Sequence, residues 1–289
     1  MDDRLQKIRQ IVNKYGMDKF YISFSGGKDS TVVSALVDLA LPGNDIPRVY
    51  ASTGIDYKMI NDFVVGLSER DDRIQVIKPS VPIKEMLERD GYPFKSKHHS
   101  EMLAIYHNNH NNESAIKYRD GLYNYSGNKC PKCLKYQFSD DFKIKISDKC
   151  CYRLKEEPLF KWQKENNKPY AILGLMREEG GRRDNAKCLA FKSGGRFNFQ
   201  PLVVVTKAWE DWFIEAYGVE ICDIYKPPYN FNRTGCKGCP FALGKDLNRN
   251  LEVLEKYFPN ERKQCEFIWK PIYDEYRRIG YRLKKEVVK

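Results

Sequence analysis

Six consecutive residues combine glycines with hydroxyl, ammonium and carboxylate side chains: Ser25, Gly26, Gly27, Lys28, Asp29 and Ser30. They lie between a short apolar run, residues 20–24, and a helical stripe of apolar residues that ends at Ala40. A glycine pair between a strand and a helix lets backbone N–H groups surround an anion at the positive end of the helix. Lys28 and the two serine hydroxyls add charge and hydrogen-bond donors. The segment therefore predicts a loop that holds phosphate groups.

The loop does not have the Walker A pattern, which requires glycine and serine or threonine where this sequence has Ile22 and Asp29. It resembles the SGGxDS signature of the PP-loop ATP pyrophosphatases and their relatives, the adenylyl sulfate and phosphoadenylyl sulfate (PAPS) reductases. The resemblance implies that residues 25–30 bind ATP, adenylyl sulfate or PAPS. It also implies that Lys28 and Asp29 are catalytic, and that Asp29 orients Mg²⁺ when ATP is bound.

Two further segments resemble the same family. Thr53 and Gly54 follow the next apolar run, at the carboxyl edge of the expected sheet, and resemble the family's Thr-Gly segment beside the nucleotide. Gly174 opens a segment that resembles the family's GLRREQSxxR pattern, in which Arg177 and Arg183 fall on the arginine positions. Guanidinium groups suit bidentate contact with a tetrahedral oxyanion. The resemblance implies that these arginines address the sulfate or phosphate of the substrate.

The arginine segment also departs from the family pattern. Met176, Glu179 and Gly180 stand where the reductases usually carry arginine, glutamine and serine. The identity of the substrate therefore stays open from the sequence.

Four of the nine cysteines form two pairs, Cys150-Cys151 and Cys236-Lys237-Gly238-Cys239. This arrangement resembles the CC and CxxC pairs that hold a [4Fe-4S] cluster in adenylyl sulfate reductases. Four thiolates satisfy the usual ligand count of such a cluster. The resemblance implies that Cys150, Cys151, Cys236 and Cys239 are iron ligands, with Lys149 and Lys237 offsetting the negative charge.

A second grouping of the cysteines is a structural zinc site. Cys130-Pro131-Lys132-Cys133 is another CxxC motif, and two such motifs commonly hold Zn²⁺ in a tetrahedron of sulfurs. In that grouping, Cys130 and Cys133 join Cys236 and Cys239. If the iron–sulfur grouping holds instead, Cys130 and Cys133 are left as thiols, a redox pair or half of another site.

The other three cysteines lie in apolar sequence contexts. We expect Cys188 and Cys222 in the core. Cys265 lies in a helical pattern, where a partly buried thiol is usually inert. The reductases attack sulfate with a cysteine in a Glu-Cys-Gly motif, and these 289 residues contain no such motif. Cys265 is therefore a weaker candidate for a nucleophile.

The remaining sequence predicts the elements that position these groups. Residues 2–15 have helical apolar spacing, and short β-rich runs alternate with helical stripes up to residue 89. Another apolar run at 170–175 and a hairpin over 188–201 predict additional strands. Such alternation is typical of a Rossmann-like parallel α/β sheet flanked by helices. We predict a nucleotide-binding domain over 1–217 and a C-terminal, cysteine-bearing helical extension over 218–289.

The segment 92–151 is polar and predicts an insertion of helices and loops outside the sheet. All four histidines lie in it, and we expect them on the surface rather than as metal ligands: His98, His99, His107 and His110.

The composition limits the kinds of molecule that the protein is expected to bind. The formal net charge is +11, which favours polyanions such as nucleotides, tRNA or DNA, although a solvated basic surface also explains it. No stretch has the length of a membrane span, and residues 1–5 lack an apolar signal core. We therefore expect a cytoplasmic protein without membrane partners, in which clustered cysteines serve a metal or redox site. A homo-oligomer is compatible with the sequence.

These observations lead to a functional hypothesis with two alternatives. The leading one is an ATP-dependent sulfurtransferase that forms AMP and pyrophosphate and thiolates a nucleic acid, with a sulfur-donor protein as a further partner. The first alternative is an adenylyl sulfate or PAPS reductase that forms sulfite. The second is a nucleotide-binding subunit without catalytic activity.

Overall fold

The computed structural model of the chain describes residues 1–122, 129–180, 183–242 and 244–284. They form two compact units. The first unit comprises Met1–Pro79 and Lys155–Thr234, and the second comprises Ser80–Leu154 and Gly235–Lys289. Each unit is thus built from two separate stretches of the chain. The sequence-based division between residues 217 and 218 does not coincide with these boundaries and stays a prediction.

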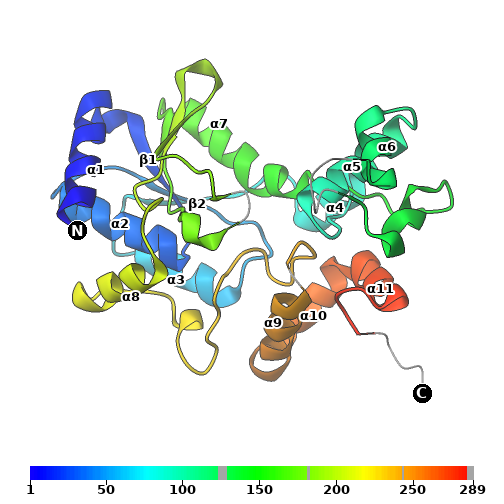
Figure 1. The fold of residues 1–289 in the computed structure, drawn as a ribbon. Helices are drawn as coiled ribbons and strands as arrows, with labels where there is room; N and C mark the ends of the chain where they lie inside the picture. The colour runs from blue at the N-terminus through cyan, green and yellow to red at the C-terminus, as the bar shows by residue number, and fades with distance from the viewer. Residues whose placement is uncertain (123–128, 181–182, 243, 285–289) are drawn as a thin grey trace. The chain divides into compact units, whose positions relative to one another are not determined.

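Within the described residues, the first unit contains a six-stranded sheet with the order β3-β2-β1-β4-β6-β5 (Figure 1). The strands are β1 (Phe20–Phe24), β2 (Arg48–Ala51), β3 (Ile74–Ile77), β4 (Tyr170–Ile172), β5 (Leu189–Phe191) and β6 (Phe197–Phe199). Strand β5 runs antiparallel to β6, and the other neighbouring pairs are parallel. The predicted parallel α/β sheet and the predicted hairpin are therefore confirmed.

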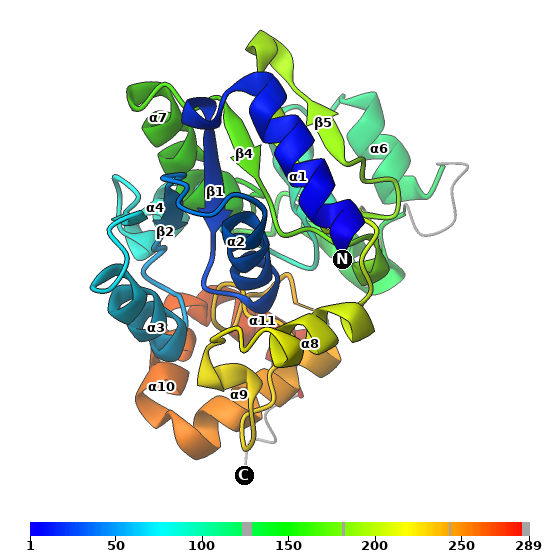
Figure 2. The same ribbon diagram turned by 90° about the vertical axis from the view of Figure 1, so that its left-hand side faces the viewer.

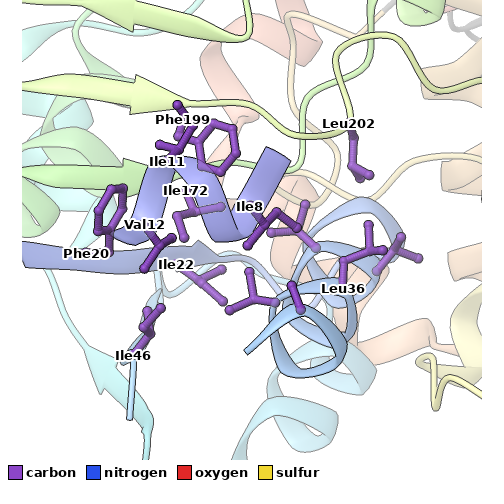
Figure 3. Packing of buried hydrophobic residues seen from close by; sticks show 14 of the residues in the cluster. Ile8, Ile11, Val12, Phe20, Ile22, Leu36, Ile46, Ile172, Phe199 and Leu202 are labelled. Carbon is purple, nitrogen blue, oxygen red and sulfur yellow. The ribbon is translucent and has the colours of Figure 1, made fainter. Parts of the chain in front are cut away.

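Helices cover both faces of this sheet. They are α1 (Asp2–Tyr15), α2 (Lys28–Ala40), α3 (Lys58–Ser68), α7 (Glu157–Glu165) and α8 (Lys207–Ala216). Side chains of α1, α2 and α8 share one buried cluster with β1, β4 and β6. Figure 2 shows the backbone of these three helices, and Figure 3 shows side chains of the cluster from α1, α2 and the strands. Trp162 of α7 packs in a second cluster with Tyr21 and Val49. Because successive side chains of a strand point to opposite faces, Phe20 and Ile22 join the first cluster and Tyr21 joins the second.

The order of the strands creates a switch point at the centre of the sheet. Strand β1 pairs with β2 on one side and with β4 on the other. After β1, the chain passes through α2 to β2 on one side of the sheet. After β4, it continues to β5 and β6 on the other side. The carboxyl ends of β1 and β4 therefore lie side by side, and the connections that follow them run in opposite directions. In open parallel sheets, ligands bind in the crevice that this arrangement leaves. The glycine loop after β1 and the segment after β4 are therefore placed to form a site.

The second unit is mainly helical. Its helices are α4 (Ile83–Asp90), α5 (Lys97–Asn108), α6 (Glu113–Asp120), α9 (Gly244–Tyr257), α10 (Pro259–Ile268) and α11 (Lys270–Ile279). An isolated parallel bridge joins Tyr92 to Ile146. In the part of the chain that is described, no helix combines the length and the apolar character needed to cross a membrane.

The expectation that all four histidines lie on the surface is wrong for His99. Its side chain is 0% exposed, with Nδ1 2.9 Å from Tyr118 Oη and Nε2 2.8 Å from Gln137 Oε1. Burial lowers the pKa of His99 to about 4, so the ring is neutral at physiological pH. The polar composition of the segment misled the prediction, because two of its polar side chains satisfy the ring within the unit's interior.

Arg48 of β2 is a buried cation whose removal should lower stability. Its guanidinium donates to Ser34 Oγ at 3.0 Å, Asn44 Oδ1 at 3.0 Å and Asp38 Oδ1 at 2.5 Å. We expect Arg48→Ala to lower the free energy of unfolding by roughly 3 kcal/mol, because both the packing and the paired charge are lost. Urea denaturation measures this.

The matched control for Arg48 is Arg70→Ala. Arg70 pairs with Glu220 on the surface, where both side chains are more than half exposed. Such pairs contribute about 0.5 kcal/mol. Equal losses from the two variants would contradict a structural role for Arg48.

Candidate functional site

A cavity of ≈ 310 Å³ lies in the first unit where β1 and β4 end. Residues after both strands line it, and so do residues from α8 and from the segment 225–234. Its lining includes the predicted loop residues Ser25, Gly27, Lys28, Asp29 and Ser30, together with Gly174 and Arg183. Residues that the sequence did not single out also line it: Lys207, Glu210, Tyr225, Asn232, Arg233 and Thr234.

The backbone of the glycine loop is fixed by its own hydroxyl groups. Ser25 Oγ lies 3.0 Å from Ser30 Oγ, and Ser30 Oγ donates to Gly27 O at 2.9 Å. Gly26 has φ +66°, and a Cβ there would lie 2.6 Å from a methyl group of Val64. Only glycine fits both the conformation and the space. Helix α2 begins at Lys28, so the N–H groups of its first turn are available to an anion.

Lys28 is held in place by an acidic residue of α8. Its Nζ lies 2.6 Å from Asp211 Oδ1, and both residues belong to the first unit. The ammonium group is only partly exposed, whereas the Asp211 carboxylate is mostly exposed. The pair orients the lysine beside the loop while leaving it able to exchange its partner for a phosphate.

Glu210, the neighbour of Asp211, is a buried acid in this cavity. It is 2% exposed, and its carboxyl group interacts electrostatically with that of Asp29. Burial and the charge of Asp29 raise the pKa of Glu210 to about 8. Within the described residues, its Oε1 atom has no hydrogen-bond partner. Nothing in the loop motif signals this residue, because it comes from a helix far along the chain.

Two arginines meet at Glu179. Arg183 and Arg233 both form ion pairs with this carboxylate, the second at 2.9 Å. Both arginines line the cavity, and the predicted role of Arg183 stays a prediction. Arg177, by contrast, donates through Nε to Ala186 O at 2.7 Å and is absent from the described lining. Residues 181 and 182 of this segment lie outside the described residues.

Thr53 and Gly54 form a tight turn after β2. Thr53 is buried, its N–H donates to Asp56 Oδ2 at 2.6 Å, and its Oγ1 accepts from Ile55 N–H at 3.3 Å. Gly54 has φ +77°, as such a turn requires. The described lining of the cavity includes neither residue. Their role in binding nucleotide stays a prediction.

Tyr225 closes the loop from the side. A Cβ on Gly27 would lie 3.3 Å from Tyr225 Oη, and this hydroxyl is hydrogen-bonded to Thr234 Oγ1. Burial raises the pKa of Tyr225 to about 12, so the hydroxyl stays protonated. The segment 225–234 thus contributes one wall of the cavity.

At Gly174, the segment that follows β4 comes very close to the backbone of the glycine loop. A Cβ at this position would lie 2.5 Å from Asp29 O and 2.9 Å from Ser30 N. Both are backbone atoms, so a flexible side chain cannot relieve the overlap. We expect Gly174→Ala to push the two segments apart, to cost about 2 kcal/mol of stability and to weaken nucleotide binding.

The control for Gly174→Ala is Gly66→Ala in α3. No atom lies within 4 Å of the added methyl group there, and alanine favours the helix by about 0.5–1 kcal/mol. Thermal denaturation and calorimetry with an ATP analogue compare the two variants. A Gly174→Ala protein as stable as the control would show that the close approach is unimportant.

The second unit brings the four predicted cluster cysteines into one region. A hydrogen bond with Cys151, burial and the charges of Cys239 and Cys236 all raise the pKa of the Cys150 thiol. The four sulfurs therefore interact electrostatically, although the described residues contain no group of three or more His, Cys, Asp or Glu side chains already arranged around a metal position. Their role as iron ligands stays a prediction.

The CxxC turn is anchored by three aromatic side chains: Trp269, which lies between α10 and α11, and Tyr273 and Tyr276 of α11. Trp269 Nε1 donates to Lys237 O at 2.8 Å, and Tyr273 Oη donates to Gly238 O at 2.5 Å. Tyr276 Oη donates to Pro240 O at 2.9 Å. The backbone of the turn is thus fixed before any ligand binds. This support was not evident from the sequence.

Lys237 makes a different contact from the one expected. Its side chain is buried and pairs with Glu261 Oε2 at 2.6 Å. This pair neutralises its charge, so Lys237 contributes less to offsetting a cluster than its position in the CxxC motif indicates.

Cys265 lies beside the CxxC turn, because a Cβ on Gly238 would lie 2.9 Å from Cys265 Sγ, whereas Cys130 interacts with other residues. Burial raises the pKa of Cys130 to about 11, and the charges that act on it come from Lys95, Lys135 and Cys133. Cys265 lies in α10, is 0% exposed, and has a pKa raised by burial to about 12.

The predicted core position is confirmed for Cys222, which is buried, and Cys188 is half-buried against the main cluster.

Comparison with known proteins finds a match to one protein family and similarity to one curated relative. Residues 103–242 match the phosphoadenosine phosphosulfate reductase domain, a stretch that contains both cysteine pairs and Gly174 but starts after the glycine loop. An uncharacterized protein of Methanocaldococcus jannaschii is 24% identical over 268 residues, which cover 89% of this chain and 52% of the relative. The chain spans about half the length of this curated relative.

Solved structures share the fold. PAPS reductase from Candida auris, in a phosphate complex, has a TM-score of 0.50 at 13% identity, covering 81% of this chain and 87% of that one. The U34-tRNA thiolase NcsA from Methanococcus maripaludis, solved with its [4Fe-4S] cluster, has a TM-score of 0.42 at 13% identity, covering 93% and 77%. The first likeness supports the PP-loop type of fold, and the second is too low to carry an argument.

Proposed function

Since the chain carries a domain of the PAPS reductase family on a PP-loop type of fold, we propose that it is an ATP-dependent sulfurtransferase that forms AMP and pyrophosphate. The observation that carries this proposal is the cavity at the switch point of the sheet. It combines the N-terminus of α2 with Lys28, Arg183, Lys207 and Arg233, a cationic set that matches a polyphosphate.

The residues of the cavity suit adenylyl transfer. In this reaction an oxygen of the acceptor attacks the α-phosphorus, a new P–O bond forms, and the bond to pyrophosphate breaks. Sulfur at the sulfide level, supplied by the donor, then attacks the acceptor atom that bears this oxygen, and the bond between that atom and the oxygen breaks, so AMP leaves with no change of oxidation state. Negative charge grows on the departing pyrophosphate, where Lys28 and the N–H groups of the loop would stabilise it. Asp29, at the start of α2, is placed to hold Mg²⁺ against the phosphates.

The cysteine region fits an iron–sulfur cluster by the chemistry of its donors. Cys150, Cys151, Cys236 and Cys239 supply four thiols, the last three of which raise the cost of ionising Cys150, and cationic iron would relieve that cost. When bound, a cluster supplies redox chemistry or a site for sulfide. The zinc grouping is less favoured, because Cys130 interacts with Cys133 rather than with the second pair.

Reduction of adenylyl sulfate or PAPS is the second candidate, and the family match favours it. It requires an accessible thiolate to attack the sulfate. Cys265 does not meet that requirement, since it is fully buried and its pKa is about 12. We therefore rank transfer of sulfur to an activated acceptor above sulfite formation.

A nucleic acid is the acceptor class that we propose. The chain carries 50 basic and 39 acidic residues, and this excess attracts a polyanion over long range. A sulfur-donor protein is the corresponding second partner.

The test uses protein purified under anaerobic conditions, ATP labelled at the α-phosphate, and sulfide as the sulfur source. We expect labelled AMP and an equal amount of pyrophosphate, with the rate increased by tRNA or DNA. Asp29→Asn should abolish the reaction, and the exposed α8 variant Glu215→Gln should retain it. Sulfite released from PAPS with thioredoxin, without pyrophosphate from ATP, would support the reductase and overturn the proposal.

A further inference from the structure

Glu210 is one of three acids, with Asp29 and Glu179, in a cavity that four basic side chains also line, and its position is fixed by the helix that carries it. Thr206 Oγ1 accepts from Trp209 N–H at 3.2 Å, and Glu210 N–H donates to Thr206 O at 2.9 Å, so the first turn of α8 is capped. Phe213 of the same helix is 0% exposed in the main hydrophobic cluster. Glu210 therefore reaches the cavity from a rigid support.

Within the described residues, hydrogen bonds do not fully satisfy the Glu210 carboxyl group. It interacts electrostatically with Asp29, which is itself an acid, and its Oε1 atom is buried without a partner among the described residues. Buried polar atoms are almost always satisfied, and two neighbouring carboxylates disfavour each other's charged form unless a cation or a proton lies between them. Both residues line the same cavity.

Nucleotide binding would make this arrangement less favourable still. A polyphosphate brings several negative charges next to two acids, while Lys28 already has Asp211 as a partner 2.6 Å away. Mg²⁺ resolves the conflict, because it binds through one or two carboxylates together with phosphate oxygens. The oxygens of Asp29 and Glu210 are hard ligands of the kind that Mg²⁺ and Mn²⁺ prefer.

We infer that Asp29 and Glu210 together form a divalent-cation site in which Glu210 is the second protein ligand to the metal that accompanies the nucleotide. The inference rests on the proposed binding of nucleotide at the glycine loop. It adds a ligand that the loop motif does not contain. Glu210 would hold the metal at the side of the cavity formed by α8.

The experiment measures metal binding without turnover. Electron paramagnetic resonance counts free Mn²⁺ while the metal is titrated into the full chain with the non-hydrolysable analogue AMPCPP. For Glu210→Gln, which keeps size and hydrogen bonding but loses the charged ligand, we expect the Mn²⁺ affinity to fall at least about tenfold. Asp29→Asn should have a similar effect. Glu215→Gln, an exposed acid on the same helix, is the matched control and should bind Mn²⁺ like the unaltered protein.

Calorimetry with AMPCPP in EDTA separates failure of this inference from failure of the proposed function. Analogue binding together with unchanged Mn²⁺ affinity in Glu210→Gln would overturn the cation site and leave the nucleotide site standing. No analogue binding, with or without Mn²⁺, would overturn both. A circular dichroism melt of each variant shows whether it is folded, and a Glu210→Asp variant that regains part of the Mn²⁺ affinity would support direct ligation.

Discussion

Replacing Cys236 by serine is expected to remove most of the iron from protein purified without oxygen, from about four atoms per chain to less than one. The expectation follows from the proposed ligand set, in which Cys236 and Cys239 form one turn and Cys150 and Cys151 form the other. Serine has nearly the same size, and aromatic side chains anchor the turn at Lys237, Gly238 and Pro240, so its backbone should persist. Iron and sulfide analysis and the visible absorption spectrum report the result.

Cys133→Ser is the matched control for this experiment. Cys133 is exposed and belongs to the other CxxC motif, so its replacement should leave the iron content unchanged if the proposed grouping is right. A colourless protein whose zinc is lost in both variants would establish the alternative grouping. Loss of iron from Cys133→Ser alone would contradict the proposed ligands outright.

The second large effect is expected at Lys28. Lys28→Ala should weaken the binding of ATP or AMPCPP by roughly 10- to 100-fold, because a charge-assisted hydrogen bond to phosphate contributes about 1.5–3 kcal/mol. Lys28 is the first residue of α2 and its side chain is partly exposed, so alanine should be tolerated by the fold. Isothermal calorimetry measures the affinity.

Lys161→Ala provides the comparison for Lys28→Ala. Lys161 lies on α7 in the same unit, and its side chain is mostly exposed. Its replacement by alanine removes an identical charge at a position away from the cavity. Its effect on affinity should be within about twofold, since exposed charges are screened by salt. If both variants bind equally well, the phosphate is not held by the glycine loop.

The helices and strands could be predicted from the sequence better than the long-range contacts between their residues. Apolar periodicity placed the helix 2–15 and the strands 20–24 and 74–77 where the structure has them, because each pattern records burial on one face of a local element. The glycine loop was equally visible, since its conformation depends on residues next to one another. Its position at the end of β1 followed from the alternation of strands and helices.

The residues that complete the site could not be predicted from the sequence, because they are far from the glycine loop along the chain. Glu210, Asp211 and Arg233 follow the loop by well over a hundred positions, and only the packing of α8 and of the segment before Thr234 brings them to it. An acid on an amphipathic helix normally indicates a solvated face. His99 was misjudged similarly, because its hydrogen-bond partners come from α6 and from the segment that follows it.

The path of the chain through the two units bears on how the protein matures. The first unit is complete once Thr234 has been synthesised, whereas the second still lacks its final segment, including Cys236 and Cys239. Because domains tend to fold as units during synthesis, from the N-terminus onward, the nucleotide cavity is expected to assemble on the ribosome while Cys150 and Cys151 await their counterparts. Insertion of iron would then be one of the last events in the life of the nascent polypeptide, and a chain that ends after residue 234 would bind ATP with its divalent cation but no iron–sulfur cluster.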